Sequence, residues 1–584
     1  IYLAVRNFKI VFNIYKYHKM NFYNNNSQKE KMLENFMNCG IAHTNSKNYS
    51  QALKFFRRVI TQDPKNFFAL KYIGDVFKCK LDNSNALYFY EQSLRINPNF
   101  IDAINECAII LKKIGNLKSS LQMFKKSLKL KKSISIQSQI LSLKMHMCDW
   151  DRFDNFNFLI KQLKSFEDYI SPFSTLAIED SPSNNLLRSK IYVKSFFSPE
   201  KNNIFKSDYN NKLIKIGYFS SDFYDHATLS LMSELPKYHN KKLFSIHAYC
   251  YGKIKTGKLR GDFIKYLDNF TNIDRMSNEE IRELVKSHKI DIAIDLKGFT
   301  NGSRSGIFSE RIAPIQINYL GYPSTMGAEF IDYIIADKTV IPFKQRKNYS
   351  EKIIYLPNSY QPNNCNRVCP SLKTKKTDFG ITNKSFVFAN LNGSYKITKK
   401  EFTVWMKILK EVDNSILWLL NSNKWMIANL SKEARLRGVN PRRLIFADPL
   451  PYRQHLERLR HIDLVLDTFN CNSHTTASDA LWMEVPVLTK SGKQFAARVC
   501  SSLLNAVNLS ELVTENIDDY KRLAVELGRN KNKLLQIKRK IKFGKKNKPL
   551  FDTKRYTKNL EKGLLGAFLI SRRKEQHKDI IINE

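Results

Sequence analysis

The sequence predicts an α-helical repeat array followed by an α/β region with two parallel sheets in tandem. Small and aromatic residues recur at a fixed interval through the first third of the chain, as they do in stacked helix pairs. From residue 213 onward, short apolar runs alternate with helical patterns, which is the form of βαβ units. A polar stretch at 361–378 divides these runs into two sets. The 584 residues, 43% of them hydrophobic, suffice for about three or four folding units.

The repeat has a period of 34 residues. The positions that share this spacing are Gly40, Gly74 and Ala108; Ala52, Ala86 and Ser120; Phe56, Tyr90 and Phe124; and Ile60, Leu94 and Leu128. A small residue allows two helices to cross closely, an aromatic residue fills the gap beside it, and Pro64 and Pro98 close two of the units. The pattern resembles the tetratricopeptide repeat, in about three copies over 31–132. We expect its concave face to hold an extended segment of a protein substrate or partner; a purely structural spacer is the alternative.

The segments that flank the repeats carry weaker signals. Residues 1–30 are expected to be an N-terminal extension, and Met20 is a candidate for the true start. Basic side chains interrupt the first 19 residues, so neither a membrane-spanning helix nor a signal peptide is expected there. Residues 133–210 are expected to contain helices and loops that join the repeats to the α/β region.

The α/β region is expected to form two lobes, 211–360 and 379–562, joined by the linker 361–378 and followed by a basic tail at 563–584. The first set of apolar runs is LIKIGYFS, LFSIHAYCY, DIAIDLKG, IQINYLGY and DYIIADK, and the second is SFVFANLN, SILWLL, RLIFADP, DLVLD and VPVLT. Parallel sheets bind ligands at the carboxyl ends of their strands, so a cleft between the lobes is the expected site. Neither the P-loop nor the G-x-G-x-x-G pattern occurs, which argues against a nucleoside triphosphatase and a nicotinamide enzyme.

Two strand ends in the second lobe carry residues suited to binding a diphosphate. The run SHTT at 473–476 lies at an expected helix start, where unpaired N–H groups and the positive end of the helix dipole favour an anion. Ordinary N-capping is the alternative role for these side chains. Lys396 lies on the turn after another strand, where it is placed to neutralise a leaving diphosphate without a metal. A solvated surface lysine is the alternative.

His226 follows the first strand of the first lobe and is expected to face the cleft from the opposite side. A His at this place can act as a base or donate a hydrogen bond to a sugar. Helix capping and burial in the core are the alternatives for this residue.

The composition adds expectations about partners and compartment. The net charge of +42 comes from Lys spread along every segment, so we interpret it as solvated surface charge with no specific nucleic-acid partner. A polyanion or membrane-surface role is the alternative. Nine Cys without a paired framework favour free thiols in a reducing compartment, and a cytoplasmic location is expected. Cys365 and Cys369 have no second pair or His at ligand spacing, so no metal site is expected.

Several longer motifs resemble the catalytic region of protein O-linked N-acetylglucosamine transferases, a family that includes bacterial members and the SPINDLY proteins. The motifs are SSDFYDHATLSLM, APIQINYLGYPSTMGAEFIDYIIAD, YSEKIIYLP, NGSYKI, HTTASDALW and LFDTKRYT. They occur in the family's order, and with the repeats the resemblance extends to near residue 560. It implies a GT-B fold, in which two Rossmann-like lobes hold a UDP-N-acetylglucosamine donor. It also implies inverting transfer to Ser or Thr of a protein or peptide acceptor, with no metal or other cofactor, and a homo-oligomer formed through the repeats is a further expectation.

The resemblance assigns roles to individual positions. His226 falls on the family's active-site His, and Lys396 on the Lys that contacts the donor diphosphate. The implied donor-binding residues are Gly393, Tyr395, Leu450, Pro451, Tyr452, His455, Arg458, His474, Thr475, Thr476 and Asp479. Among these, the run 474–476 falls on the diphosphate-binding helix start, Asp479 on the residue that holds the ribose, and His455 on the His beside the uracil ring. The implied lining of the sugar and acceptor cleft is Leu320, Gly321 and Thr325.

The chain departs from the animal members of this family at two donor-site positions. Gly393 replaces a Gln, and Tyr452 replaces a Lys near the uracil, so the diphosphate residues match the family more fully than the base pocket does. Protein O-fucosylation from GDP-fucose, as the SPINDLY branch implies, is the alternative activity. A non-catalytic repeat scaffold and a nucleic-acid binder are the alternatives outside the enzymes.

Overall fold

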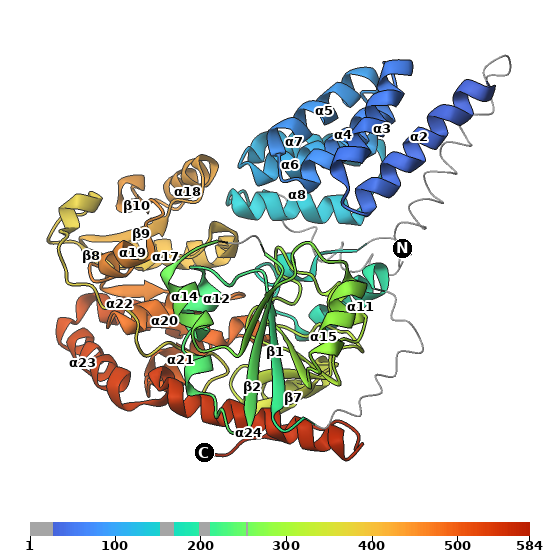
Figure 1. The fold of residues 1–584 in the computed structure, drawn as a ribbon. Coiled ribbons are helices and arrows are strands. Elements are labelled where there is room, and N and C mark those ends of the chain that lie inside the picture. Colours follow the sequence, from blue (N-terminus) through green and yellow to red (C-terminus); the bar gives the residue numbers. More distant parts are fainter. Residues whose placement is uncertain (1–26, 152–168, 198–210, 253–254) are drawn as a thin grey trace. The chain divides into compact units, whose positions relative to one another are not determined.

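The computed structural model describes residues 27–151, 169–197, 211–252 and 255–584, and these divide between two units, 1–143 and 144–584 (Figure 1). The expectations for residues 1–26, including a start at Met20, lie outside the described residues. Each unit is built from a different architecture, and the second one contains both sheets.

The first unit is an array of antiparallel helix pairs. The helices are α2 (Ser27–Asn45), α3 (Tyr49–Gln62), α4 (Phe67–Cys79), α5 (Asn83–Ile96), α6 (Ile101–Lys113), α7 (Leu117–Leu130) and α8 (Ile134–His146), the last of which ends in the second unit. The second helices of the pairs begin at 49, 83 and 117, so the 34-residue period of the sequence is the period of the fold.

The predicted packing of small against aromatic residues is confirmed in this array. A Cβ added to Gly40 would lie 2.5 Å from the ring of Phe56, and one added to Gly74 would lie 2.6 Å from the ring of Tyr90. A side chain at either glycine would therefore push the paired helices apart. Asn48, Asp82 and Asn116 cap the second helix of each pair, which fixes where that helix begins.

The second unit begins with short helices and then forms an eight-stranded parallel sheet. The helices before this sheet are α10 (Pro172–Thr175) and α11 (Pro182–Phe196). The strands are β1 (Ile214–Ser220), β2 (Phe244–Cys250), β3 (Asn269–Asn272), β4 (Ile292–Asp295), β5 (Ile315–Asn318), β6 (Tyr333–Asp337), β7 (Lys352–Leu356) and β14 (Ile580–Ile581), in the order β14-β7-β6-β5-β4-β1-β2-β3. The helices among them are α12 (Ala227–Met232), α13 (Leu235–Tyr238), α14 (Lys258–Ile264), α15 (Asn278–Ser287) and α16 (Gly306–Ser309).

The remaining strands form a second parallel sheet of six strands. They are β8 (Phe386–Asn390), β9 (Ser415–Leu420), β10 (Leu444–Ala447), β11 (Leu464–Leu466), β12 (Val487–Lys490) and β13 (Val513–Thr514), in the order β10-β9-β8-β11-β12-β13. The helices are α17 (Lys399–Glu411), α18 (Lys424–Leu436), α19 (Tyr452–Leu459), α20 (Thr475–Trp482), α21 (Val499–Ala506), α22 (Ile517–Arg529), α23 (Lys531–Asn547) and α24 (Thr553–Arg572). All ten apolar runs singled out in the sequence contain strands of these two sheets.

The C-terminal residues 563–584 are not the basic tail expected from the sequence. Helix α24 continues to Arg572, and Leu560 and Leu564 on it are buried against Ile354 of the first sheet (Figure 1). Strand β14 then pairs in parallel with β7 at the edge of that sheet. The chain therefore returns to the first lobe because one face of α24 is apolar, although most of its other side chains are polar.

The linker 361–378 is also more ordered than a simple connection. Gln361, Asn363 and Arg367 are each no more than 7% exposed, and Gln361 Nε2 donates to Ser478 Oγ at 2.6 Å. The segment therefore packs on α20 and contributes side chains to the second lobe.

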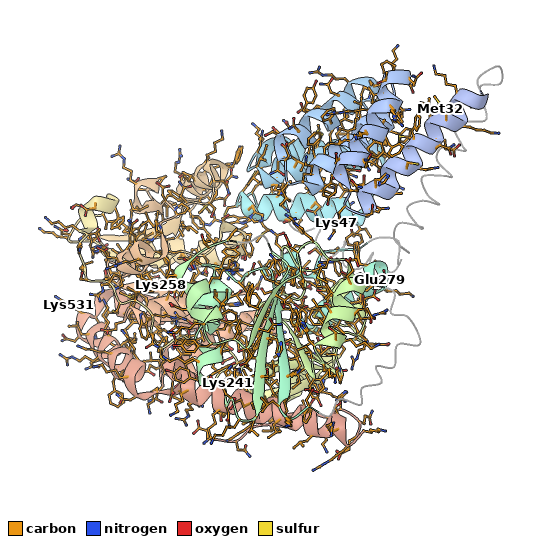
Figure 2. The ribbon with its side chains drawn as sticks, in the orientation of Figure 1. Met32, Lys47, Lys241, Lys258, Glu279 and Lys531 are labelled. Atoms are coloured by element: carbon orange, nitrogen blue, oxygen red, sulfur yellow. The ribbon has the colours of Figure 1, made fainter. Side chains whose placement is uncertain are left out.

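The surface carries much of the excess positive charge. Lys258 at the start of α14, Lys531 at the start of α23 and Lys241 in the loop before β2 are exposed and extend outward from the second unit (Figure 2). All nine Cys are free thiols. None of the helices in the described part of the chain has the length and apolar character needed to cross a membrane.

Candidate functional site

The expected site residues gather where the strand order of each sheet reverses. In the second sheet this point lies between β8 and β11, and in the first sheet it lies between β1 and β4. Loops that leave the carboxyl ends of such strands diverge, and the crevice between them binds ligands in open α/β sheets. Lys396 lies on the loop after β8, His474 on the loop after β11, and His226 on the loop after β1.

One hydrophobic cluster joins the carboxyl ends of the two sheets. It contains Phe299 and Tyr322 from the loops after β4 and β5, and Cys471 and Ala496 from the loops after β11 and β12. Tyr395, next to Lys396, packs against the same cluster. The two lobes therefore face each other with their ligand-binding edges, which is the arrangement expected for a cleft between them.

Asn392 ties together the two loops of the second lobe. Its Nδ2 donates to Ser473 Oγ at 2.6 Å, and its Oδ1 accepts from Thr476 Oγ1 at 2.7 Å. In the same place, Lys396 Nζ donates to the carbonyl oxygen of Asn472 at 2.7 Å. The structure thus brings Lys396 and the start of α20 together.

The turn that carries Lys396 is anchored by the last residue of α8, His146, and by Trp150 shortly after it. Ser394 Oγ donates to the carbonyl oxygen of His146 at 2.7 Å, and Trp150 Nε1 donates to the carbonyl oxygen of Ile397 at 3.3 Å. Trp150 is buried against Phe402, with ring centroids 5.6 Å apart. The turn that carries Lys396 is therefore held by hydrogen bonds before the lysine, at Ser394, and after it, at Ile397.

Lys396 provides a fixed positive charge in this crevice. Its side chain is 9% exposed. Burial by itself lowers the pKa of Lys396, but Cys471, Tyr395 and Asp467 raise it, and the net pKa lies above the ordinary value. The side chain is therefore a cation at neutral pH, in surroundings where a charge acts more strongly than it does in water.

The ring of Tyr395 occupies the space beside Gly393 where a side chain would lie. A Cβ at Gly393 would lie 2.8 Å from the Tyr395 ring, so a longer residue there would require the ring to move. The ring in turn packs near His146, with centroids 5.3 Å apart. A Gly at this position therefore leaves room for the aromatic ring.

The start of α20 leaves its N–H groups available to a ligand. His474 is the N-cap residue, and no side chain caps the helix there. The hydroxyls of Ser473 and Thr476 bond to Asn392 instead of the helix end. The alternative that these hydroxyls serve only as N-caps is thus not what the structure shows. Thr475, the first residue of α20, is half-buried beside them.

His474 does not contribute a positive charge to this end of the helix. Burial and the nearby Lys396 lower the pKa of His474 to about 3. Its Nε2 lies 3.4 Å from the carbonyl oxygen of Ala496, which can only accept, so the proton is on Nε2. The positive potential at this point therefore comes from Lys396 and the helix dipole.

Asp479 lies one turn into α20 and is buried. Arg367 and Tyr452 both donate hydrogen bonds to the same oxygen of its carboxylate. Arg367 Nη1 donates to Asp479 Oδ1 at 2.8 Å, and the Tyr452 hydroxyl donates to it at 2.9 Å. Arg367 Nη2 also donates to Asn363 Oδ1 at 2.6 Å. Burial raises the pKa of Asp479 despite the guanidinium beside it. Asp479 is therefore held by a residue of the segment between the lobes.

Tyr452, His455 and Arg458 share one face of α19. Arg458 Nε and Nη2 donate to His455 Nδ1 at 3.2 and 2.9 Å. Since Arg can only donate, the proton of neutral His455 is on Nε2, which is free to donate to a ligand. Burial and Arg458 lower the pKa of His455 to about 4, so this state holds at neutral pH. Leu450 and Pro451, half-buried and exposed respectively, lead into the helix, of which Pro451 is the N-cap residue.

His226 caps the short helix α12 in the first lobe. Its Nδ1 accepts from the backbone N–H of Thr228 at 3.2 Å, so the proton of the neutral ring is on Nε2. Burial lowers the pKa of His226, and Asp222, at 3.6 Å, opposes this effect. The Asp222 carboxylate is itself paired with Lys297 Nζ at 2.7 Å. His226 thus caps the helix, which was one of the alternative roles expected for it. Its Nε2–H also points outward as a hydrogen-bond donor.

The three residues expected to line the sugar and acceptor cleft occupy different environments. Leu320 has a φ of 69°, a strained value for a residue with a side chain. A Cβ on Gly321 would lie 2.1 Å from the carbonyl oxygen of Leu296, so only Gly fits there. Thr325 is 1% exposed and its hydroxyl donates to Glu351 at 2.6 Å, which makes it a buried support of this loop.

Several residues of this site were not identified from the sequence. They are Asn392, Arg367, Trp150, and the Asp222 and Lys297 pair. Asn392 and Asp222 directly follow strands, which is a signal the sequence offered. Arg367 and Trp150 lie in segments interpreted as connections, and only the folded chain brings them to the site. No group of three or more His, Cys, Asp or Glu side chains that could hold a metal occurs within the described ranges.

Comparison with known proteins identifies the family. Residues 186–378 and 368–560 match the model of glycosyl transferase family 41, and these ranges cover more than half of the chain. The protein belongs to glycosyl transferase family 41.

Similar proteins agree with this assignment. The chain is 34% identical over 381 residues to the probable UDP-N-acetylglucosamine–peptide N-acetylglucosaminyltransferase SEC of Arabidopsis thaliana, covering 64% of this chain and 39% of that protein. It is 26% identical over 469 residues to the UDP-N-acetylglucosamine–peptide N-acetylglucosaminyltransferase of Caenorhabditis elegans, covering 61% and 41%. The chain thus spans about two fifths of the length of these relatives.

The fold also matches a solved structure. A mutant of the Thermobaculum terrenum O-GlcNAc transferase aligns with a TM-score of 0.68 and 20% identity, covering 94% of this chain and 99% of that one. The likeness shows the fold: a helical repeat array with the two-lobed α/β architecture of the GT-B type, as predicted from the sequence.

Proposed function

We propose that the protein transfers N-acetylglucosamine from UDP-N-acetylglucosamine to Ser or Thr hydroxyls of other proteins, with inversion at the anomeric carbon and without a metal. The observation that carries this proposal is the joined pair of loops at the switch point of the second sheet. There Lys396 Nζ lies 2.7 Å from the Asn472 carbonyl oxygen, beside the uncapped start of α20. A buried cation and a helix N-terminus at one point form a site for a diphosphate.

The relatives support the choice of donor and acceptor. The matched proteins of Arabidopsis and Caenorhabditis are both named as peptide N-acetylglucosaminyltransferases that use UDP-N-acetylglucosamine. We assign one part of the site to each part of such a donor. The start of α20 and Lys396 would bind the diphosphate, Asp479 the ribose, and the face of α19 with His455 the base.

In the proposed reaction, the oxygen of an acceptor hydroxyl attacks the anomeric carbon as the bond from that carbon to the diphosphate oxygen breaks. The hydroxyl proton passes to solvent water, and the departing diphosphate oxygen keeps the electron pair of the broken bond, so negative charge builds on the diphosphate. Lys396 and the N–H groups at the start of α20 would stabilise that charge. Because both are present before the reaction begins, no reorganisation is needed when the charge develops.

His226 would serve this reaction as a hydrogen-bond donor. As a general base, it would have to accept the acceptor proton on Nε2, which already carries one in the neutral ring. Moving that proton to Nδ1 would break the contact with the Thr228 N–H at 3.2 Å. We therefore assign His226 to orienting an oxygen of the donor or acceptor through Nε2–H.

The repeat array would present the acceptor protein. Helix pairs stacked with a constant period offer a continuous surface for an extended segment. The nine free thiols fit a reducing compartment such as the cytoplasm, which we propose as the place of action.

A panel of sugar nucleotides tests this function. Purified protein is incubated with an acceptor-containing lysate fraction and, separately, UDP-N-acetylglucosamine, GDP-fucose or other sugar nucleotides, and intact-mass spectrometry detects the added sugar. Addition of one N-acetylhexosamine mass from the UDP donor is the expected result. Addition of fucose from the GDP donor would instead assign the alternative activity, and no transfer from any donor would favour a non-catalytic scaffold.

A further inference from the structure

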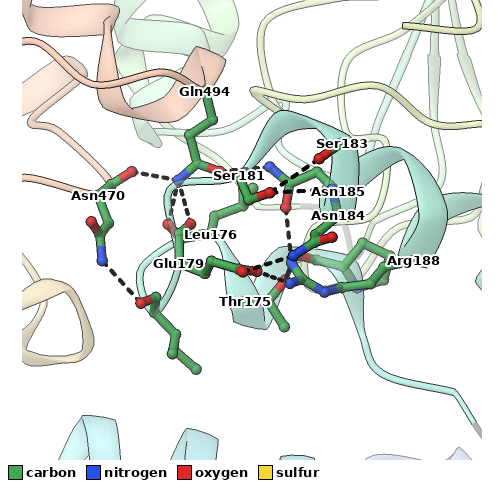
Figure 3. A network of polar contacts seen from close by, with 12 residues as sticks. Thr175, Leu176, Glu179, Ser181, Ser183, Asn184, Asn185, Arg188, Asn470 and Gln494 are labelled. Atoms are coloured by element: carbon green, nitrogen blue, oxygen red, sulfur yellow. Dashed lines mark hydrogen bonds and ion pairs between the residues drawn. The ribbon is translucent and has the colours of Figure 1, made fainter. Parts of the chain in front are cut away.

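The segment 175–188 forms a polar network with the second lobe (Figure 3). It runs from the end of α10 into α11. Within it, Arg188 pairs with Glu179 and donates to Thr175 Oγ1 and Asn185 Oδ1, both at 3.0 Å. The segment is therefore held in shape by its own side chains and presents a fixed set of acceptors to the second lobe.

Gln494, on the loop between β12 and α21, is the residue through which this segment contacts the second lobe. Its side chain is 1% exposed. Its Nε2 donates to the carbonyl oxygens of Leu176 at 2.8 Å, Glu179 at 2.9 Å and Asn470 at 2.7 Å (Figure 3). Its Oε1 accepts from Asn185 Nδ2 at 2.5 Å. Every hydrogen-bonding group of the amide is thus used, and one bond reaches the loop after β11.

Other contacts between the same segments support this connection. The Asp180 carboxylate accepts from the backbone N–H groups of Lys493 at 2.9 Å and Gln494 at 2.8 Å. Asn470 Nδ2 donates to the carbonyl oxygens of Ala177 and Ile178 at 3.1 and 3.0 Å. The beginning of the loop after β11 is therefore attached to the 175–188 segment at several points.

The loop fixed in this way is the one that meets Lys396. Asn472 N donates to the Ala496 carbonyl oxygen at 2.8 Å, and the Asn472 carbonyl oxygen accepts from Lys396 Nζ at 2.7 Å. His474, the N-cap residue of α20, lies 3.4 Å from the same Ala496 oxygen. Gln494 is two residues from Ala496 in sequence. Gln494 therefore fixes the loop after β11, which contacts Lys396 and leads into α20. It also fixes its own loop after β12, whose Ala496 oxygen contacts Asn472 and His474.

We infer that Gln494 is a positioning residue for the diphosphate site: its amide links the 175–188 segment to the loop 470–474 and so fixes the Lys396 contact and the start of α20. That Gln494 orders the loop 470–474 follows from the contacts alone. That this ordering aids binding of a donor diphosphate rests on the proposed function. A Gln fits this place because one amide supplies an acceptor for Asn185 and two N–H donors, one of them shared, for the three carbonyl groups.

Two variants and a control test this role. Gln494→Met keeps the length of the side chain and removes its hydrogen bonds. Asn470→Ala removes the two bonds from the same loop to the carbonyl oxygens of Ala177 and Ile178, at a position that is only half-buried. It decides the matter if the first variant does not fold. Gln536→Met changes an exposed Gln on α23 and serves as the matched control.

The first measurement is hydrogen exchange, in the ligand-free protein, of the backbone amides of Asn472 and Ser473, which donate to the Ala496 carbonyl oxygen and to Asp467 Oδ1. One net hydrogen bond corresponds to roughly a tenfold change in an equilibrium constant, so exchange there should quicken by about tenfold or more in both variants. Amides of β8 and β9, and all amides of Gln536→Met, should keep the wild-type rates. Unchanged exchange of the Asn472 and Ser473 amides in both variants would overturn the inference.

The second measurement compares affinity for UDP with affinity for uridine. The variants should bind UDP about tenfold more weakly and uridine as the wild type does, because only the diphosphate contacts the positioned loop. Equal weakening of both ligands would indicate general damage and contradict a positioning role. If the wild type bound no UDP, the proposed function would fail, while the exchange rates would still decide whether Gln494 orders the loop.

Discussion

Replacement of Lys396 by Met should remove most transferase activity while leaving the fold intact. The methionine keeps nearly the same length and volume but lacks the positive charge. Its turn remains anchored by Ser394 and Trp150 through contacts that do not involve the lysine side chain. The effect on the rate should therefore come from the charge alone.

The size of this effect follows from the burial of the lysine. With 9% of its side chain exposed, Lys396 is shielded from bulk water. A unit charge about 4 Å from the departing diphosphate is worth about 4 kcal/mol at an effective dielectric constant near 20, against about 1 kcal/mol in water. Loss of one such contact typically slows kcat by a factor on the order of 10² to 10³. We expect a loss of this size.

The assay measures kcat and KM for the sugar nucleotide that the donor panel identifies. Lys399→Met, at an exposed position three residues along the chain, is the control and should retain wild-type kinetics. Circular dichroism and thermal melting should show Lys396→Met folded. A folded Lys396→Met protein with a rate within about threefold of wild type would refute the assignment. A rate loss that small corresponds to less free energy than the contact of an exposed charge in water provides.

Three further predictions concern residues around the same cleft. Arg367→Met should lower the free energy of unfolding by about 3–5 kcal/mol in urea titrations, because it leaves the buried Asp479 carboxylate without its cation; exposed Arg522→Met is the control, and equal stabilities would contradict the ion pair. His226→Gln, which keeps a donor near the Nε2 position, should retain more turnover than His226→Asn, which keeps only the helix cap, whereas equal and complete loss in both would point to a general base. Burial raises the pKa of Glu401 to about 7, so its stabilising contribution is complete below the ordinary pKa of 4.5 and is lost as the pH rises through 7. The wild type should thus lose up to about 3 kcal/mol of stability relative to Glu401→Gln between pH 4.5 and 8, and parallel pH curves for the two proteins would exclude this titration.

Much of the fold could be predicted because its signals are local and repeated. The 34-residue spacing of Gly40 and Gly74 reflects a helix crossing that recurs with the same geometry, and each buried parallel strand is a short apolar run. The C-terminal segment was interpreted wrongly because α24 carries many Lys and Arg on its exposed face. Strand β14 is only two residues long, and its place at the edge of the first sheet depends on a pairing with β7, more than 200 residues earlier in the chain.

The candidate site, too, could be predicted from the sequence only where its signals are local. Lys396 and His474 could be identified because each follows a strand, and strand ends in parallel sheets meet at one edge. That they contact one another through Asn392 and Asn472 depends on side-chain directions that no spacing in the sequence encodes. Three of the four hydrogen bonds of the Gln494 side chain go to residues more than 300 positions away. Two of these three accept through backbone carbonyl groups, so the identity of those residues carries no signal in the sequence.

A structure of the protein with bound UDP tests the central claim most directly. The claim predicts diphosphate oxygens within about 3 Å of Lys396 Nζ and of the first N–H groups of α20, with the ribose beside Asp479. A diphosphate bound elsewhere, out of reach of both the lysine and the helix start, would contradict it.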